Sequence, residues 1–300
     1  MIIRAVLLAV LVMTGIAFIS AWRRAVNIRQ DTARWPSSTQ LVIGFVTDFF
    51  DTLGIGSFAT TTAAYKLSNI VRDEKLVGTM IVGHSLPVVA QALIFIAAVK
   101  VDPIALGSLI AASMLGGWVG AGICSRLPVR PIQITISIGL IAAATFMMMS
   151  QLGVFPTGGT ALTLPVGKLM FALAVNFILG MLLMLGIGNY APSLIIFSLL
   201  GMDPRAAFPI MMGSGALMAM AGGFRFIQAA KFDRRAALGL TLGGIPGVLV
   251  AGLIVKSLPL SVLRWMVVAV VIYAATMMLR SATKRPKPSL LLEPEPGPAL

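Results

Sequence analysis

Long apolar segments, separated by short polar connections, run along almost the whole chain. Most are about 20 residues long, which is the length with which a helix crosses the hydrocarbon core of a bilayer. The pattern predicts an all-α polytopic membrane protein with no separate soluble domain. The apolar segments lie near residues 5–21, 41–65, 77–99, 103–123, 129–150, 167–200, 207–228, 236–256 and 260–280.

The chain also repeats itself at an offset of about 130 residues. "LGIGSFAT" at 53–60 returns as "LGIGNYAP" at 185–192, and "IVGHS" at 81–85 lines up with "MMGSG" at 211–215. We therefore expect two copies of one transmembrane unit. The predicted division is an N-terminal helix and basic linker (1–38), a first repeat (39–150), an inter-repeat linker (151–166), a second repeat (167–280) and a cytoplasmic Pro-rich tail (281–300).

Composition agrees with a membrane protein and excludes several other classes. Apolar residues make up 58% of the chain and charged residues only 11%, whereas soluble domains carry about 25% charged residues. The net charge is +13, but the basic residues lie at the ends of apolar segments. That distribution is typical of membrane topology rather than of nucleic-acid binding. Cys124 is the single cysteine, so we expect no disulfide framework, no thiol-metal cluster and no cofactor.

The distribution of Lys and Arg predicts how the two copies are oriented. If all nine apolar segments cross, the 23 Lys and Arg residues divide 14 against 9 between the two sides. If the two segments that carry "LGIG" enter the membrane and return, the division becomes 17 against 6. Because Lys and Arg concentrate on the cytoplasmic side, the second arrangement is favoured. It predicts two inverted repeats with about seven full transmembrane helices and two re-entrant broken segments.

The broken segments are the predicted binding site. Gly54 and Gly56 interrupt one apolar run, and Gly186 and Gly188 interrupt the other. Unwound backbone at membrane depth is tolerated where it is buried in protein or lines a cavity, and the N-terminus of the following half-helix suits an anion. The alternative is that these glycines only allow close helix packing. The polar residues that follow the breaks, and that we expect to bind substrate, are Ser57, Thr60, Thr61, Asn189, Tyr190 and Ser193.

Two copies of a short Gly-rich motif near the start of each half resemble the TauE/SafE sulfite exporter family, also called the toluene-sulfonate uptake permeases. The resemblance covers roughly residues 41–280. It implies a multi-pass protein of the bacterial inner membrane that moves sulfite, sulfonates, sulfoacetate or related small organic anions. The first motif departs from the family pattern of G-x-G-G-G with a following proline, and the proline is kept only in the second copy, as Pro192.

Two carboxylates stand out because they lie inside an apolar segment. Asp48 and Asp51 are spaced to share one face of a helix, and their partners in the second copy are Gly180 and Leu183. A charged carboxylate at the centre of a bilayer costs about 2.5–3.5 kcal/mol on insertion scales. With His84, the single histidine, they are candidates for proton coupling. The alternative is a structural role in which they pair with nearby groups.

These observations favour proton-linked secondary transport of a small organic or sulfur-containing anion, and they favour a transporter over an enzyme. A cation uptake transporter that uses Asp48, Asp51 and His84 as ligands is the alternative. An intramembrane aspartyl enzyme is disfavoured because both carboxylates come from one helical turn, and a passive channel stays open. The expected partners are the substrate anion, protons and the lipid bilayer, with no nucleic acid and no metal, and a homo-oligomer stays open.

Overall fold

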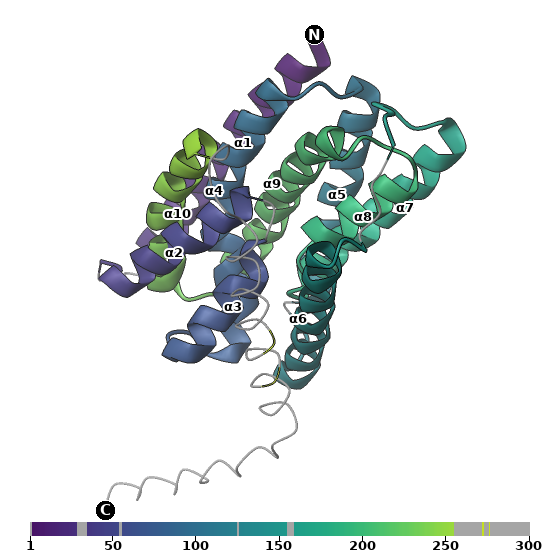
Figure 1. Cartoon of the computed structure of the whole chain (residues 1–300). Coiled ribbons are helices and arrows are strands. Elements are labelled where there is room, and N and C mark those ends of the chain that lie inside the picture. Colours follow the sequence, from purple (N-terminus) through teal and green to yellow (C-terminus); the bar gives the residue numbers. More distant parts are fainter. Residues whose placement is uncertain are drawn as a thin grey trace, which may run out of the picture.

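The computed structural model describes residues 2–28, 35–53, 56–124, 126–154 and 159–254, together with residues 272 and 276 (Figure 1). Over these ranges the chain is helical, as the apolar pattern predicts, and the structure contains no strand there. The helices are α1 (Ile2–Ile28), α2 (Ser38–Thr52), α3 (Ser57–Ser68), α4 (Asp73–Ala98), α5 (Pro103–Cys124), α6 (Val129–Gln151), α7 (Val166–Leu183), α8 (Tyr190–Leu199), α9 (Pro204–Ala229) and α10 (Arg234–Ile254).

Six helices within the described part of the chain are long and apolar enough to cross a membrane, so the protein is an integral multi-pass membrane protein. The six are α1, α4, α5, α7, α9 and α10. Helix α6 forms where the sequence predicts a helix but is not among the six. Apart from residues 272 and 276, the predicted helix at 260–280 lies outside the described residues, as do residues 29–34 of the basic linker and the tail at 281–300. The expected number of seven full helices therefore stays a prediction.

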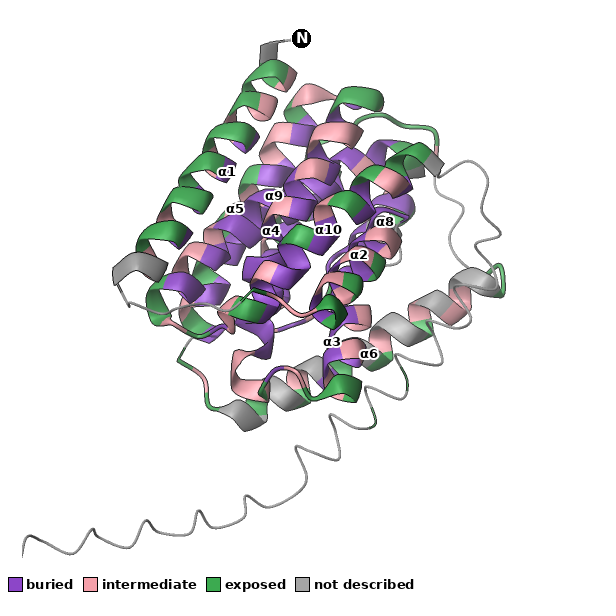
Figure 2. Cartoon of the chain, turned by 90° about the vertical axis from the view of Figure 1, so that its left-hand side faces the viewer, coloured by how far each residue is buried: buried purple, intermediate pink, exposed green. Residues whose placement is uncertain are grey.

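Helices α4 and α9 form the centre of the molecule and pack against each other. In α9, 83% of the membrane-length window is buried, compared with 22% in α1, which lies along the outside (Figure 2). The other helices exchange partners between the two copies of the repeat. Helix α2 packs on α10, and α7, its counterpart in the second copy, packs on α5. The first half-helix of each copy is thus held by the other copy, which brings the two breaks to the middle of the molecule.

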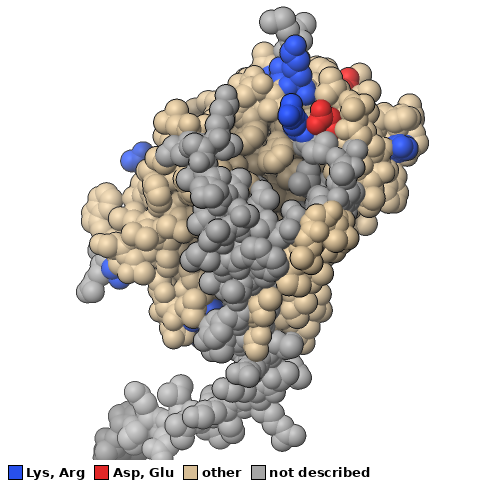
Figure 3. Space-filling model, in the orientation of Figure 1, with Lys and Arg blue, Asp and Glu red and all other residues tan. Residues whose placement is uncertain are grey.

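The outer surface fits a lipid environment. Large apolar side chains such as Met13, Ile16 and Leu115 are exposed. Figure 3 shows that on this face the described Lys, Arg, Asp and Glu side chains lie toward the two ends and the margins, while the intervening described surface is uncharged. Because lipid tails cannot solvate charge, this division between ends and middle is the one that a membrane protein needs.

Local sequence explains where the half-helices begin and end. A capping box starts α2: the hydroxyl of Ser37 accepts a hydrogen bond from the backbone N–H of Gln40, and the Gln40 side chain accepts one from the N–H of Ser37. Gly56, with φ +93°, precedes α3, and Gly186, also with φ +93°, lies between α7 and α8. Only glycine adopts this backbone without strain. At 1.5 Å per residue, α3 and α8 extend only about 15–18 Å, so neither spans a bilayer.

Small residues let α10 approach α2 closely. A Cβ atom at Gly243 would fall on the carbonyl oxygen of Leu41 in α2, whereas one at Gly252, farther along α10, would meet only Ile94 Cδ1 at 3.6 Å. The two glycines therefore differ in packing although they share one helix.

We predict that Gly243→Ala lowers the thermal unfolding temperature in detergent, because the added methyl group forces α2 and α10 apart. Overpacking a close contact costs about 1–3 kcal/mol. Gly252→Ala is the matched control and should leave the unfolding temperature nearly unchanged. Equal unfolding temperatures for the two variants would contradict the close packing of α2 on α10.

Candidate functional site

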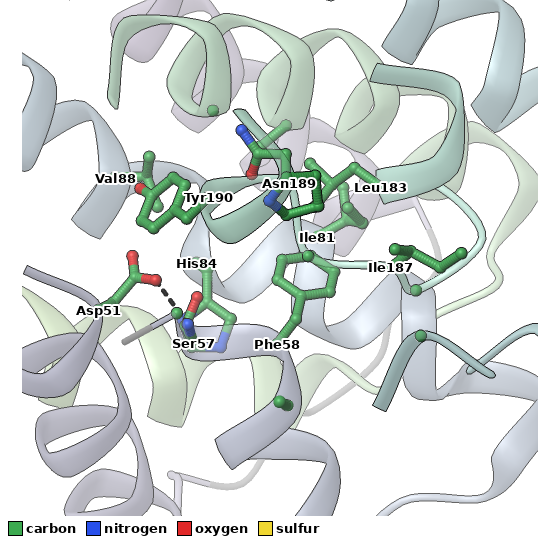
Figure 4. A pocket seen from close by; sticks show the side chains of 18 of the residues that line it. Asp51, Ser57, Phe58, Ile81, His84, Val88, Leu183, Ile187, Asn189 and Tyr190 are labelled. Carbon is green, nitrogen blue, oxygen red and sulfur yellow. Dashed lines mark hydrogen bonds between the residues drawn. The ribbon is translucent and has the colours of Figure 1, made fainter. Parts of the chain in front are cut away.

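A cavity of about 70 Å³ lies between the two breaks (Figure 4). Holding one water takes roughly 10–15 Å³, so the cavity has room for several waters or one small ion. Both copies of the repeat contribute to it: Asp51, Ser57 and His84 lie on one side, and Asn189 and Tyr190 face them from the other. Apolar side chains complete the lining, among them Phe58, Ile81, Val88, Leu183 and Ile187.

The break glycines serve the cavity rather than close helix packing. A Cβ at Gly56 would meet no atom within 4 Å, and one at Gly188 would meet only Phe58 Cβ at 3.8 Å. Gly56, Gly186 and Gly188 all line the cavity. At Gly56 and Gly188 the described residues leave room for a Cβ atom, so close helix packing does not account for these two glycines; Gly186 shares with Gly56 a φ of +93°. Gly54 lies outside the described residues.

The carboxylate of Asp51 occupies the N-terminus of α3. Its Oδ1 accepts a hydrogen bond of 2.5 Å from the backbone N–H of Ser57, the first residue of that helix. Asp51 is 2% exposed. Helix N-termini stabilise negative charge through free N–H groups and the helix dipole. In the first copy, the anion at this helix N-terminus is thus a side chain of the protein itself.

The second oxygen of Asp51 is connected by hydrogen bonds to Tyr190, which lies in the other copy of the repeat. Gln91 Nε2 in α4 donates to Asp51 Oδ2 at 2.8 Å and to Thr52 Oγ1 at 3.1 Å. The hydroxyl of Tyr190, at the start of α8, donates to Gln91 Oε1 at 2.9 Å. Gln91 is fully buried. A continuous chain of hydrogen bonds therefore joins Asp51 beside the first break to Tyr190 beside the second.

Asp48 belongs to a separate chain of contacts. Both of its carboxylate oxygens lie 2.9 Å from His84 Nδ1, and His84 Nε2 lies 2.9 Å from Thr61 Oγ1. Asp48 is completely buried and does not line the cavity, whereas His84 does. A Cβ at Gly244 in α10 would fall on Asp48 Oδ2, so this glycine makes the space for the carboxylate. The contacts tie α2, α3 and α4 together.

The second copy has a helix N-terminus without an acid. Leu183 stands where the sequence alignment places the partner of Asp51, and Asn189 precedes α8 without a side-chain capping hydrogen bond. Asn189 Nδ2 and Ser193 Oγ are buried and have no hydrogen-bond partner among the described residues. Asn189 is 5% exposed and Ser193 is 1% exposed. Leaving such groups unpaired costs about 1–3 kcal/mol each, which makes this helix start suited to a ligand with acceptor oxygens.

The structure brings most of the predicted site residues together, with three differences of position. Thr60 turns back on its own helix, where its hydroxyl donates to the carbonyls of Gly56 and Ser57. Thr61 contacts His84, and neither Thr61 nor Ser193 is among the residues that line the cavity. The predicted residues that line the cavity are Asp51, Gly56, Ser57, His84, Gly186, Gly188, Asn189 and Tyr190.

Gln91 is the residue that the sequence analysis missed. It is a lone amide in "VVAQALIF", an otherwise apolar stretch of α4. The rule that singled out Asp48 and Asp51 also applies to it, because polar side chains inside membrane segments are costly and tend to be functional. The sequence does not reveal its partners, which lie 40 and 99 residues away.

The fold and this cavity define a class: integral multi-pass membrane proteins with a buried polar site between two broken helices. Residues 168–299 match the family described as sulfite exporter TauE/SafE. The resemblance drawn from the glycine motifs is thereby confirmed over the second half of the chain. The matched range contains the second break, Asn189 and Tyr190, but not Asp48, Asp51 or His84. No curated protein and no solved structure matches the chain.

Proposed function

We propose that the protein is a proton-linked secondary transporter of a small sulfur-containing or organic anion, of the sulfite, sulfonate or sulfoacetate type, in a bacterial inner membrane. The observation that carries the proposal is the buried donor at the start of α8 that lines the cavity and has no partner among the described residues, Asn189 Nδ2. The family match supports the class of substrate.

The anion binds at the start of α8 because that end offers donors and no negative charge. Asn189 and Tyr190 line the cavity there, and the backbone N–H groups of the first turn of α8 have no acidic side chain near them in the sequence. A sulfonate or sulfite group presents three oxygens as acceptors, and its charge is favoured by the helix dipole. The equivalent position at α3 is taken by Asp51.

The link to protons follows from Asp51 on the opposite side of the same cavity. Two like charges about 4 Å apart repel by about 4 kcal/mol at an effective dielectric constant near 20, and the repulsion falls as their separation grows. Protonation of Asp51 removes that repulsion, so the anion binds more tightly when a proton is bound. Transport of one then favours transport of the other.

The alternatives fit the contacts less well. Asp48 faces His84, while Asp51 faces the N–H of Ser57 and the amide of Gln91. A cation site would need these carboxylates to converge on one point, and an aspartyl enzyme would need them to share a proton across a substrate. Here each carboxylate already faces donors of its own.

A second cavity offers a path toward the site. It has a volume of about 460 Å³ and is lined by Thr52 and Leu53 at the end of α2, next to the first break. Two exposed cations, Lys100 and Arg205, lie at this cavity. Positive charge at an opening raises the local concentration of anions, which is the sign that the proposed substrate requires.

The proposed arrangement in the membrane is two inverted repeats, residues 39–150 and 167–280, with re-entrant segments at the two breaks. The exchange of helices between the copies, α2 with α10 and α7 with α5, supports this arrangement. So does the distribution of Lys and Arg. The arrangement places residues 66–76 on the cytoplasmic side, and Lys100 and Arg205 on the other side.

We predict that Asn189→Ala weakens anion binding by about tenfold or more, because it removes a hydrogen bond to a charged group worth about 1.5–3 kcal/mol. Binding of methanesulfonate and of sulfite to purified protein, measured by calorimetry, provides the readout. Ser198→Ala is the matched control: its hydroxyl is also buried and unpaired, but it lies at the far end of α8. Unchanged affinity in Asn189→Ala would place the anion elsewhere.

We also predict opposite accessibility for residues 72 and 205. In a Cys124→Ala background, a membrane-impermeant thiol reagent added to intact cells should label Arg205→Cys but not Arg72→Cys. The side chain of Arg72 is 80% exposed, so its protection would come from the membrane and not from the fold. Strong labelling of Arg72→Cys from outside would remove the re-entrant arrangement.

A further inference from the structure

We propose that Gln91 is a positioning residue whose amide turns over when Asp51 gains a proton, and that this turn releases the hydroxyl of Tyr190 to bind the anion. The inference rests on the proposed function and gives it a mechanism of coupling between the two breaks. It is carried by the geometry of one buried chain of three side chains: Asp51, Gln91 and Tyr190.

The present direction of the hydrogen bonds fixes one state. With Asp51 as a carboxylate, the only role of its Oδ2 is to accept, and Gln91 Nε2 donates to it at 2.8 Å. The opposite end of the amide is then the acceptor Oε1, which takes the hydrogen of the Tyr190 hydroxyl at 2.9 Å. In this state the Tyr190 hydrogen points at Gln91 and is not offered to the cavity that Tyr190 lines.

Protonation of Asp51 reverses the donor and acceptor roles in both hydrogen bonds that join Asp51, Gln91 and Tyr190. A proton from cavity water binds to Oδ2, which becomes an O–H donor, while Oδ1 still accepts from the N–H of Ser57. The Gln91 amide nitrogen cannot accept a hydrogen bond. The amide therefore turns by about half a rotation, so that Oε1 faces Asp51 and Nε2 donates to the Tyr190 oxygen. Tyr190 keeps its proton and is free to donate it to an anion at the start of α8.

The surroundings restrict this response to Asp51. From α2 it is faced by Asp48, from α3 by Ser57, and from α4 by Gln91 and His84; Tyr190 faces it from α8. Helix α10, packed on α2, carries no ionisable side chain after Arg234 and Arg235 in its first turn. Asp48 is held by His84 through both oxygens and has no contact with Gln91. Of the two carboxylates, Asp51 is the one that lines the cavity and accepts a hydrogen bond from the Gln91 amide.

The first test follows Tyr190 directly and needs no substrate. The chain has three tyrosines, so tyrosine labelled with ¹³C at Cζ gives a simple spectrum in lipid, and Tyr190→Phe assigns the signal. The Tyr190 shift should change with pH in the wild type. It should stay at the low-pH position in Asp51→Asn, whose amide donates to Gln91 at any pH, and it should respond less to pH in Gln91→Met, where only the direct effect of Asp51 on Tyr190 remains. Tyr65, which donates to the carbonyl of Ala236 at 3.1 Å, is the internal control.

A Tyr190 signal that ignores pH in the wild type, or that moves equally in Gln91→Met, overturns the proposal. Gln91→Met keeps the length and volume of the side chain, and its melting temperature shows whether it folds. If Gln91→Met does not fold, the wild type and Asp51→Asn still decide, because both retain Gln91.

The second test measures methanesulfonate, which remains a monoanion over the working pH range. Tyr190→Phe should raise its Kd about tenfold or more at low pH and change it little at high pH. In the Gln91→Met background, Tyr190→Phe should raise the Kd for methanesulfonate by the same factor at both pH values. If Tyr190→Phe lowers the affinity for methanesulfonate equally at both pH values while Gln91 is present, the inference is overturned.

The two tests separate the two claims. If the Tyr190 signal titrates but neither methanesulfonate nor sulfite binds, the proposed function fails and the Gln91 turn stands. If the anion binds at the start of α8 but the signal does not titrate, the Gln91 turn fails and the proposed function stands.

Discussion

The constraint on which the rest depends is the cost of a carboxylate inside a membrane protein. Two hydrogen bonds offset that cost for Asp51. One oxygen accepts from the backbone N–H at the N-terminus of α3, and the other accepts from the amide of Gln91. These two contacts require a break between α2 and α3, because only a helix that starts at this depth presents free N–H groups there. They also require α4 to lie where Gln91 reaches both Asp51 and Tyr190. The position of one charge thus sets the arrangement of four helices.

The two copies of the repeat have diverged around this charge. In the first copy, α2 is tied to α4 by Asp48 and His84. In the second, Asn176 donates to Ser214, which is the residue aligned with His84, so a neutral pair makes the corresponding tie between α7 and α9. The first helix break is occupied by a side chain of the protein, while the second retains unpaired donors. In our proposal, the first copy senses the proton while the second holds the anion.

Much of this could be predicted from residue patterns, because the pattern follows local physics. Glycine pairs in apolar runs predicted the two breaks, and the repeated motif predicted that they belong together. Of the polar residues after the breaks, Ser57, Asn189 and Tyr190 line the cavity, whereas Thr60, Thr61 and Ser193 do not. What could not be predicted is which polar group faces which. The hydroxyl of Thr60 donates to a backbone carbonyl of its own helix, and the neighbouring sequence does not distinguish Thr60 from Ser57. Gln91 gains its role from contacts 40 and 99 residues away, and such contacts are set by helix packing rather than by sequence neighbours.

The central claim is that an anion crosses the protein only together with a proton on Asp51. Proteoliposomes that contain the purified protein and a trapped pH indicator test it most directly, with methanesulfonate added outside. The account predicts that wild-type uptake acidifies the interior and accelerates when the outside is more acidic. It predicts that Asp51→Asn still moves the anion but no longer acidifies the interior. Acidification per anion that is equal in Asp51→Asn and in the wild type would contradict the account.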